Sequence, residues 1–257
     1  MPDTVSSFLT VKYKLHNPSR RRRALMLDAM RRAHLGYDKL LKAVREDIEA
    51  MVSIKERPER WDAIKVLAKK LQAIAKPLPL GNGPKQAIIA DALAQAESYI
   101  ELKKADENTS YPTTPRLKVE QTDFDAAIDG IANSQSILEE NEYRDLLAKL
   151  SRPGLPRPLN ILKNRIGDGA LLLQDDNERL FVFINLLPKQ AKRKRQVDLT
   201  DLIDTRTGEI MQKKTASGDI FPLECGQWHD DKFLKRGTIQ SSRLIYDDQD
   251  FYYAATF

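Results

Sequence analysis

The residues best suited to covalent chemistry are few. Cys225 and His229 are four residues apart in ECGQWHDD, and a cysteine near a histidine can form a nucleophile pair or half of a metal site. A metal site would need another soft ligand, and the sequence has no second cysteine. Carboxylates recur at Asp198, Asp201 and Asp204, where they could bind magnesium but are also typical of caps and turns. We therefore expect no catalytic residues, no bound metal ion and no cofactor in this chain.

Cations, by contrast, gather in three segments. Residues 1–45 contain eleven Lys and Arg residues and three Asp residues, a net charge of +8 in a chain whose total is +5. Five cations lie within the eight residues of PKQAKRKR (188–195), and a third group lies near residue 235. Concentrated positive charge predicts a polyanionic partner, although a solvated helix face is the alternative. The residues that we expect to bind nucleic acid are Lys12, Lys14, Arg20, Arg21, Arg22, Arg23, Arg31, Lys189, Lys192, Arg193, Lys194, Arg195, Lys235 and Arg236.

Two predicted elements position the N-terminal cations. In FLTVKYKL, apolar residues alternate with polar ones, which predicts a strand with one buried face and with Lys12 and Lys14 on the other. After Asn17-Pro18, Ser19 fits the N-cap of a helix over about 20–56 that is apolar at spacings of three and four. The four arginines start this helix, where the helix dipole disfavours cations. A phosphate backbone would compensate this cost, and solvent could also screen it.

The rest of the chain divides into a helical part and a β-rich part. Further helices are expected at about 59–76 and 84–105, because Pro77 ends one and Pro84 suits the first turn of the next. From about residue 167 the pattern becomes β-rich, with a hairpin tip at 204–209 and a second hairpin in which TIQSSRLIY (238–246) and DFYYAATF (250–257) flank a turn. A lone N-terminal strand is not stable. We therefore predict that it pairs with the C-terminal strands in one sheet or small barrel, with the helices as an insertion.

Composition limits the class of protein. The chain has 257 residues, of which 41% are hydrophobic and 31% charged, enough apolar material for a core. No apolar run approaches the roughly 18 residues that a membrane span needs, and the N-terminus lacks the pattern of a signal peptide. One cysteine excludes an internal disulfide framework. A protein of the prokaryotic cytosol without a membrane partner fits these features.

This order of elements resembles the N-terminal half of type V CRISPR effectors and of the TnpB nucleases encoded by transposons. The opening TVKYKL, followed by RRRRALMLDAMRRAHLGYDKLLKAV, resembles the start of the family's wedge domain and recognition lobe. The closing GTIQSSRLIYDDQDFYYAATF resembles the wedge hairpin that precedes the RuvC nuclease domain. The resemblance implies an α+β fold in which a small, β-barrel-like wedge domain is interrupted by a large helical insertion. It implies the first wedge strand at residues 1–17, the recognition lobe at 18–166 and the rest of the wedge at 167–257.

The resemblance also implies a function. In this family the wedge binds the guide-RNA scaffold, and the recognition lobe holds the heteroduplex of guide RNA and target DNA. A short flanking DNA motif is read where wedge and lobe meet, and Tyr111, Thr113, Thr114 and Gln240 are candidates for reading it here. The RuvC carboxylates and the paired cysteines of its zinc ribbon are absent from this sequence. We therefore expect an RNA-guided, DNA-targeting module that is no enzyme alone, with magnesium only in a partner nuclease domain.

Two further expectations concern partners and alternatives. The apolar strand that runs to Phe257 is expected to meet a RuvC-type subunit or domain, and its amides (251–257) should then exchange quickly in the isolated chain. The chain could be a split subunit, a nuclease-free derivative or a fragment of a longer protein. A stand-alone basic RNA-binding or ribosome-associated α+β protein is the alternative function. A small enzyme that uses Cys225 and His229 is a third.

Overall fold

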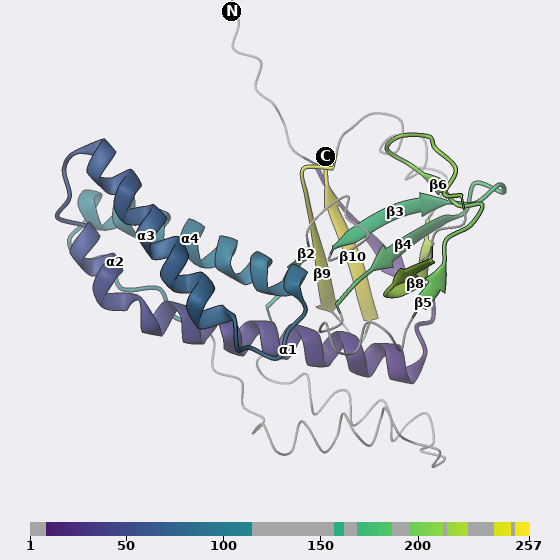
Figure 1. Cartoon of the computed structure of the whole chain (residues 1–257), viewed down its shortest axis with the longest axis horizontal. Helices are drawn as coiled ribbons and strands as arrows, with labels where there is room; N and C mark the ends of the chain where they lie inside the picture. Colours follow the sequence, from purple (N-terminus) through teal and green to yellow (C-terminus); the bar gives the residue numbers. More distant parts are fainter. Residues whose placement is uncertain are drawn as a thin grey trace, which may run out of the picture.

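The computed structural model of this protein describes residues 9–114, 157–161, 169–186, 196–212, 215–225, 239–247 and 250–257, except the side chain of Arg21. The architecture is α+β. Helices α1 (Arg20–Ala43), α2 (Arg45–Met51), α3 (Arg57–Ala75) and α4 (Asn82–Ala105) form an arm beside an antiparallel sheet (Figure 1). In the sequence these helices lie between the first strand and the others, so the sheet is assembled from both sides of a helical insertion.

Helix α1 forms where the sequence predicts it. The Ser19 hydroxyl accepts a hydrogen bond from the backbone N–H of Arg22 at 3.4 Å, which confirms the N-cap. The expected apolar stripe is buried, since these residues are each 5% exposed or less: Met26, Met30, Ala33, Tyr37, Leu40, Val44, Ile48 and Met51. The single helix expected over 20–56 is wrong in one respect. Val44 leaves the helical conformation, with φ −114° and ψ 11°, and α2 begins after it. Because Val44 stays fully buried, the stripe continues across a break that periodicity does not reveal.

The large sheet has the strand order β2-β9-β10-β1-β8-β4-β3-β6, and every pairing in it is antiparallel. Its strands are β1 (Thr10–Leu15), β2 (Leu159–Ile161), β3 (Ala170–Gln174), β4 (Leu180–Ile184), β6 (Ile203–Asp204), β8 (Asp219–Glu224), β9 (Ser241–Asp247) and β10 (Asp250–Thr256). Strands β5 (Gln196–Asp198) and β7 (Thr215–Ser217) pair separately. The predicted pairing of the first strand with C-terminal strands is confirmed, as is the β9–β10 hairpin.

Two features differ from the expected wedge. Within the described residues the sheet is open rather than closed into a barrel, because β2 and β6 are its two edges and no pairing joins them. Strand β2 also lies inside residues 18–166, the range expected to form the helical lobe, yet it pairs with β9. The short β2 thus brings the sheet into contact with the helical insertion.

Strand β10 is an interior strand. It pairs with β9 on one side and with β1 on the other, and Phe257 and Leu9 exchange backbone hydrogen bonds of 2.9 and 3.3 Å. Pairing on both sides predicts slow amide exchange over this strand, whereas the sequence analysis expected rapid exchange over 251–257. Amide exchange in the isolated chain therefore distinguishes the two predictions.

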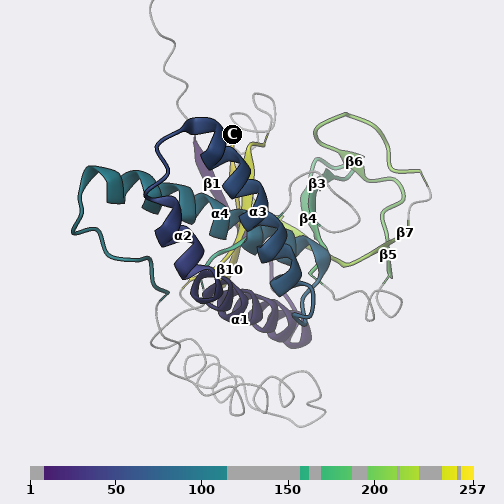
Figure 2. The same cartoon turned by 60° about the vertical axis from the view of Figure 1, so that its left-hand side comes forward.

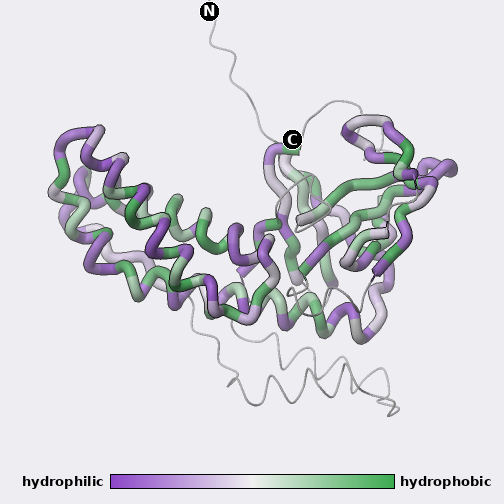
Figure 3. Tube along the Cα trace, in the orientation of Figure 1, coloured by the Kyte–Doolittle hydropathy of each residue, from purple (hydrophilic) through white to green (hydrophobic). Residues whose placement is uncertain are grey.

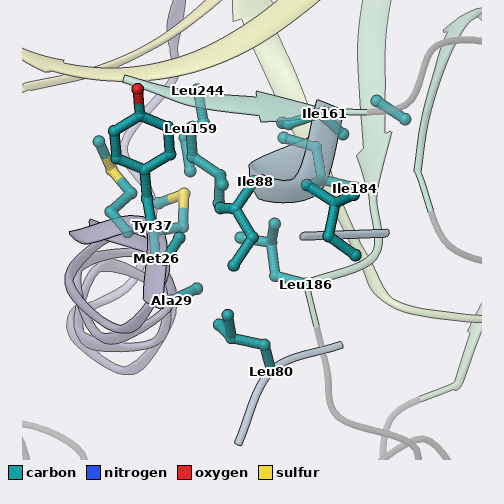
Figure 4. Packing of buried hydrophobic residues seen from close by; sticks show 14 of the residues in the cluster. Met26, Ala29, Tyr37, Leu80, Ile88, Leu159, Ile161, Ile184, Leu186 and Leu244 are labelled. Atoms are coloured by element: carbon teal, nitrogen blue, oxygen red, sulfur yellow. The ribbon is translucent and has the colours of Figure 1, made fainter. Parts of the chain in front are cut away.

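The main core lies between the arm and one face of the sheet. Figure 4 shows Met26 and Tyr37 of α1 beside Leu159 of β2 and Leu244 of β9. A second cluster, which includes Leu173 and Phe183, covers the other face of β3 and β4. Burial on both faces explains why these two strands are apolar almost without interruption (Figure 3). Within the described part of the chain, no helix combines the length and the apolarity needed to cross a membrane.

Candidate nucleic-acid interface

The predicted lysines of β1 lie on the face of the sheet opposite the core. The Lys14 ammonium is 2.7 Å from the Asp250 carboxylate, and that hydrogen bond is the main reason why the pKa of Lys14 is raised. The Lys12 ammonium is 3.6 Å from Asp247 and 5.9 Å from the ring centroid of Tyr252. Both pairs are partly exposed, so each contributes little to stability and leaves the lysine available to an external anion.

The arginines that begin α1 are engaged within the fold. The Nε of Arg22 is 3.3 Å from the carboxylate of Asp219, whose side chain is 9% exposed. The Nε of Arg23 donates to the carbonyl of Pro18 at 3.0 Å. Arg20 is half-buried and Arg31 is only 4% exposed. The protein itself thus supplies part of the compensation that we expected from phosphates.

The other predicted cations cannot be placed. Those at 189–195, together with Lys235 and Arg236, lie outside the described residues. The expectation that they bind nucleic acid therefore remains a prediction.

The residues expected to read a DNA motif do not gather at one place. The hydroxyl of Tyr111 donates to the carbonyl of Leu41 at 2.7 Å, and burial raises the pKa of Tyr111 to about 12. Thr114 hydrogen-bonds to Asp38 of α1, while Thr113 is exposed. These three lie along the C-terminal half of α1. Gln240 instead lies at the end of the sheet, where its backbone N–H donates to Thr256. The observed contacts of Tyr111 and Thr114 attach their loop to α1.

A polar pocket lies where the helical insertion meets the sheet, and the sequence reasoning missed it. Its volume is about 270 Å³, and its polar lining comes from Asp91 and Gln95 of α4, Asn160 of β2, Arg243 of β9, and Arg157. We call it the junction pocket. Asn160 and Arg243 are directly opposite each other in the β2–β9 pairing. Residues from three elements thus meet at one edge of the sheet.

Contacts around the junction pocket fix several of its side chains. The amide of Asn160 donates to the carboxylate of Asp91. The guanidinium of Arg157 lies 3.9 Å from the ring centroid of Tyr37, and its backbone N–H donates to Nδ1 of His34 at 3.2 Å. Burial is the largest influence on Asp91 and raises its pKa, although Asn160 and the two arginines oppose the shift. A partly buried carboxylate therefore orients one amide beside two cations.

The junction pocket opens onto a row of residues that crosses four strands. In register, Asn160 of β2 is opposite Arg243 of β9, then Ala254 of β10, then Lys12 of β1. The exposed side chains of Arg243 and Lys12 stand on either side of the small Ala254. This row and the junction pocket together form a surface with two exposed cations and two carboxamide groups.

Such groups can do specific chemistry. A guanidinium donates two hydrogen bonds to the edge of guanine, and a carboxamide pairs with the edge of adenine. Among the described residues, no group of three or more His, Cys, Asp or Glu side chains could hold a metal ion. Cys225 is half-buried, and His229 lies outside the described ranges.

One sequence signal points toward this surface. Asn160 in LNI and Arg243 in SRL are polar residues between buried neighbours, which marks the outward positions of two strands. That the two residues pair with each other is not visible in either sequence segment alone.

In comparisons with known proteins, no family model matches the sequence and no curated protein matches it.

Proposed function

We propose that this chain binds nucleic acid at the junction pocket and along the neighbouring row, as the recognition module of an RNA-guided, DNA-targeting effector. The observation that carries the proposal is the meeting of Arg243, Asn160 and Gln95 at the edge of the sheet. Guanidinium and carboxamide groups at one site are the combination that reads base edges. The placement of the site between sheet and helical insertion supports a role in reading the DNA motif.

The chain topology supports the more specific part of the proposal, that the chain is a module of an RNA-guided effector. A strand, a helical insertion and a returning sheet follow one another in the order expected for a wedge domain and a recognition lobe. In this proposal the sheet acts as the wedge and holds the guide-RNA scaffold through Lys12 and Lys14. The helices hold the guide–target heteroduplex, and a RuvC-type nuclease with its magnesium ions is supplied by a partner or by another part of the protein.

Preorganisation favours direct readout over general phosphate binding at the junction pocket. Arg157 is held against Tyr37, and Asn160 is held by Asp91, so neither side chain must be ordered on binding. Arg243 is exposed and free to approach a groove. We expect Arg243 to select a base, and Lys12 to contact phosphate without regard to sequence.

Binding to a guide RNA and to a duplex library randomised beside the target tests this proposal. Asn160→Ala and Arg243→Ala should change which flanking sequence is enriched, at a cost of about 1–3 kcal/mol for the preferred base. Lys12→Gln should weaken binding evenly across sequences and reduce its dependence on salt. Arg179→Ala is the matched control, because Arg179 lies on the turn between β3 and β4 and pairs with Asp175. An unchanged sequence preference in both pocket variants would refute direct readout.

The interior position of β10 favours a second function, a stand-alone RNA-binding protein. A strand that is paired on both sides needs no partner to complete its ladders. This alternative predicts structured-RNA binding that is unaffected by matched target DNA or by a RuvC-type protein. The RNA-guided module should instead bind matched DNA only when guide RNA is present.

A further inference from the structure

A groove between α3 and α4 adjoins the junction pocket and shares one lining residue with it. The groove has a volume of about 590 Å³, and Ala94 of α4 lines both hollows. Figure 2 brings α3 forward, where it lies against α4. From Ala94 the lining follows α4 to Glu101, and Trp61 and Ile64 of α3 contribute apolar side chains.

Trp61 is unusual because its side chain is exposed. It is 56% exposed, and it is the one aromatic residue among the large exposed hydrophobic residues of the described chain. Tryptophan normally buries most of its area, and an exposed indole in a groove is typical of a binding site. The flat ring lies beside Ile64 in the lining, so a planar ligand could stack on it.

Guanidinium groups accompany the indole. Arg57, one helical turn before Trp61, is exposed and lines the groove. Arg60 also lines it and pairs with Glu101, while its Nε is buried and has no hydrogen-bond partner in the described structure. Because that Nε is shielded from solvent, a ligand in the groove does not reach it, and Arg57 is the exposed cation that can meet a phosphate. Along its length α3 carries five cations and two anions.

We infer that the α3–α4 groove binds an unpaired nucleotide of a nucleic-acid strand, with the base stacked on Trp61 and a phosphate beside Arg57. Aromatic stacking combined with nearby cations is how proteins hold single strands. The carboxylate of Glu97 and the hydroxyl of Ser98, both exposed in the lining, can contact polar edges of the base. The inference relies on the proposed function only in that the ligand is nucleic acid.

The size of the groove favours a nucleotide over a peptide helix. The volume falls within the range of small-ligand sites, whereas a docked helix needs a longer apolar strip. Val66 is also exposed but does not line the groove, so the apolar surface does not continue along α3. A strand that leaves the junction pocket past Ala94 would enter the groove directly.

Tryptophan fluorescence tests the inference. The chain has two tryptophans, so Trp228→Phe leaves Trp61 as the sole reporter. Titration with oligo(dT) should quench its emission, because a stacked base quenches indole, while an abasic oligomer of equal length should not. Trp61→Leu should weaken oligo(dT) binding about tenfold, and Trp61→Phe should recover part of the loss. Arg57→Gln should make the logarithmic salt dependence shallower by about 0.7.

Val66→Ala is the matched control, since it removes an exposed apolar side chain from the same helix and should leave affinity unchanged. Equal quenching by the abasic oligomer, or no quenching by oligo(dT), would overturn the inference. A blue shift of Trp61 with an acidic amphipathic peptide, without quenching by oligo(dT), would also overturn it and identify a peptide groove. Trp61→Leu should weaken oligo(dT) binding without altering the motif preference, whereas the junction-pocket variants should leave the quenching of Trp61 intact. This difference separates the two sites.

Discussion

Replacing Arg22 with alanine distinguishes a structural role from a phosphate-binding role for the cluster that begins α1. The Nε of Arg22 is 3.3 Å from Asp219, and its guanidinium is 5.3 Å from the ring centroid of Phe221. The side chain of Asp219 is 9% exposed and that of Arg22 is 33% exposed. Truncation therefore leaves a nearly buried carboxylate with one partner fewer and uncovers part of an aromatic ring.

The size of the effect follows from this burial. Removing one partner of a fully buried ion pair costs about 3–5 kcal/mol. Water reaches a third of Arg22, and Asp219 keeps another interaction, so we expect a smaller loss of about 1–3 kcal/mol. At roughly 2–4 °C per kcal/mol for a chain of this size, the Tm should fall by about 2–12 °C.

Two measurements on the same variant provide the assay. Urea unfolding followed by circular dichroism gives the stability, and RNA binding at several salt concentrations gives the number of phosphate contacts. Arg179→Ala is the control, because Arg179 is 71% exposed, pairs with Asp175 on the β3–β4 turn and should change neither quantity appreciably. In an Asp219→Asn background, Arg22→Ala should cost less, and the difference measures the coupling.

The opposite pattern would refute the structural role. If Arg22→Ala leaves the unfolding midpoint unchanged but weakens RNA binding and flattens its salt dependence, the pair with Asp219 does not stabilise the fold. Arg22 would then act as a phosphate ligand, as the sequence suggested.

Three further outcomes are expected. Gly218→Ala should destabilise the protein by about 1–3 kcal/mol in urea unfolding, because a Cβ there would lie 2.8 Å from the carbonyl oxygen of Ile184; an unchanged unfolding midpoint would contradict the steric explanation. Hydrogen exchange of residues 251–256 should be slow in the isolated chain, and rapid exchange would contradict the interior position of β10. Burial raises the folded-state pKa of Asp91, so its contribution to wild-type stability is greatest below its unfolded pKa of about 4 and falls as pH rises through the folded pKa. The free energy of unfolding of Asp91→Asn should therefore rise relative to that of the wild type between pH 3 and 7. A difference between the two proteins that shrinks over this range would contradict the prediction.

Local pattern predicted the elements of the fold, whereas their arrangement required long-range contacts. The alternation in β1 and the apolar stripe of α1 each predict one buried face, and both buried faces are observed. The short β2 carries too few residues for periodicity to identify it, and its pairing with β9 joins segments about 80 residues apart. The open form of the sheet likewise depends on which strands are edges, and alternation within a strand does not encode that.

The candidate site shows the same limit in electrostatic terms. The sequence shows where the cations are but not which residues they pair with. Arg22 was therefore predicted to bind phosphate, whereas the structure places Asp219, nearly 200 residues later in the chain, beside it. The junction pocket was missed for the converse reason. Gln95, Asn160 and Arg243 are unremarkable singly and become a site only when α4, β2 and β9 meet.

The long separation between β1 and its neighbours has a consequence for synthesis on the ribosome. Thr10 and Thr256, whose hydroxyls are 2.9 Å apart, are separated by 246 residues. At about 5–20 residues per second, β1 would wait roughly 10–50 s after its own translation before β10 emerges. The helices, whose contacts are local, can form during that interval. The nascent chain would thus expose the apolar side of β1 beside a folded helical arm, and it would need protection from aggregation until the sheet closes around that strand.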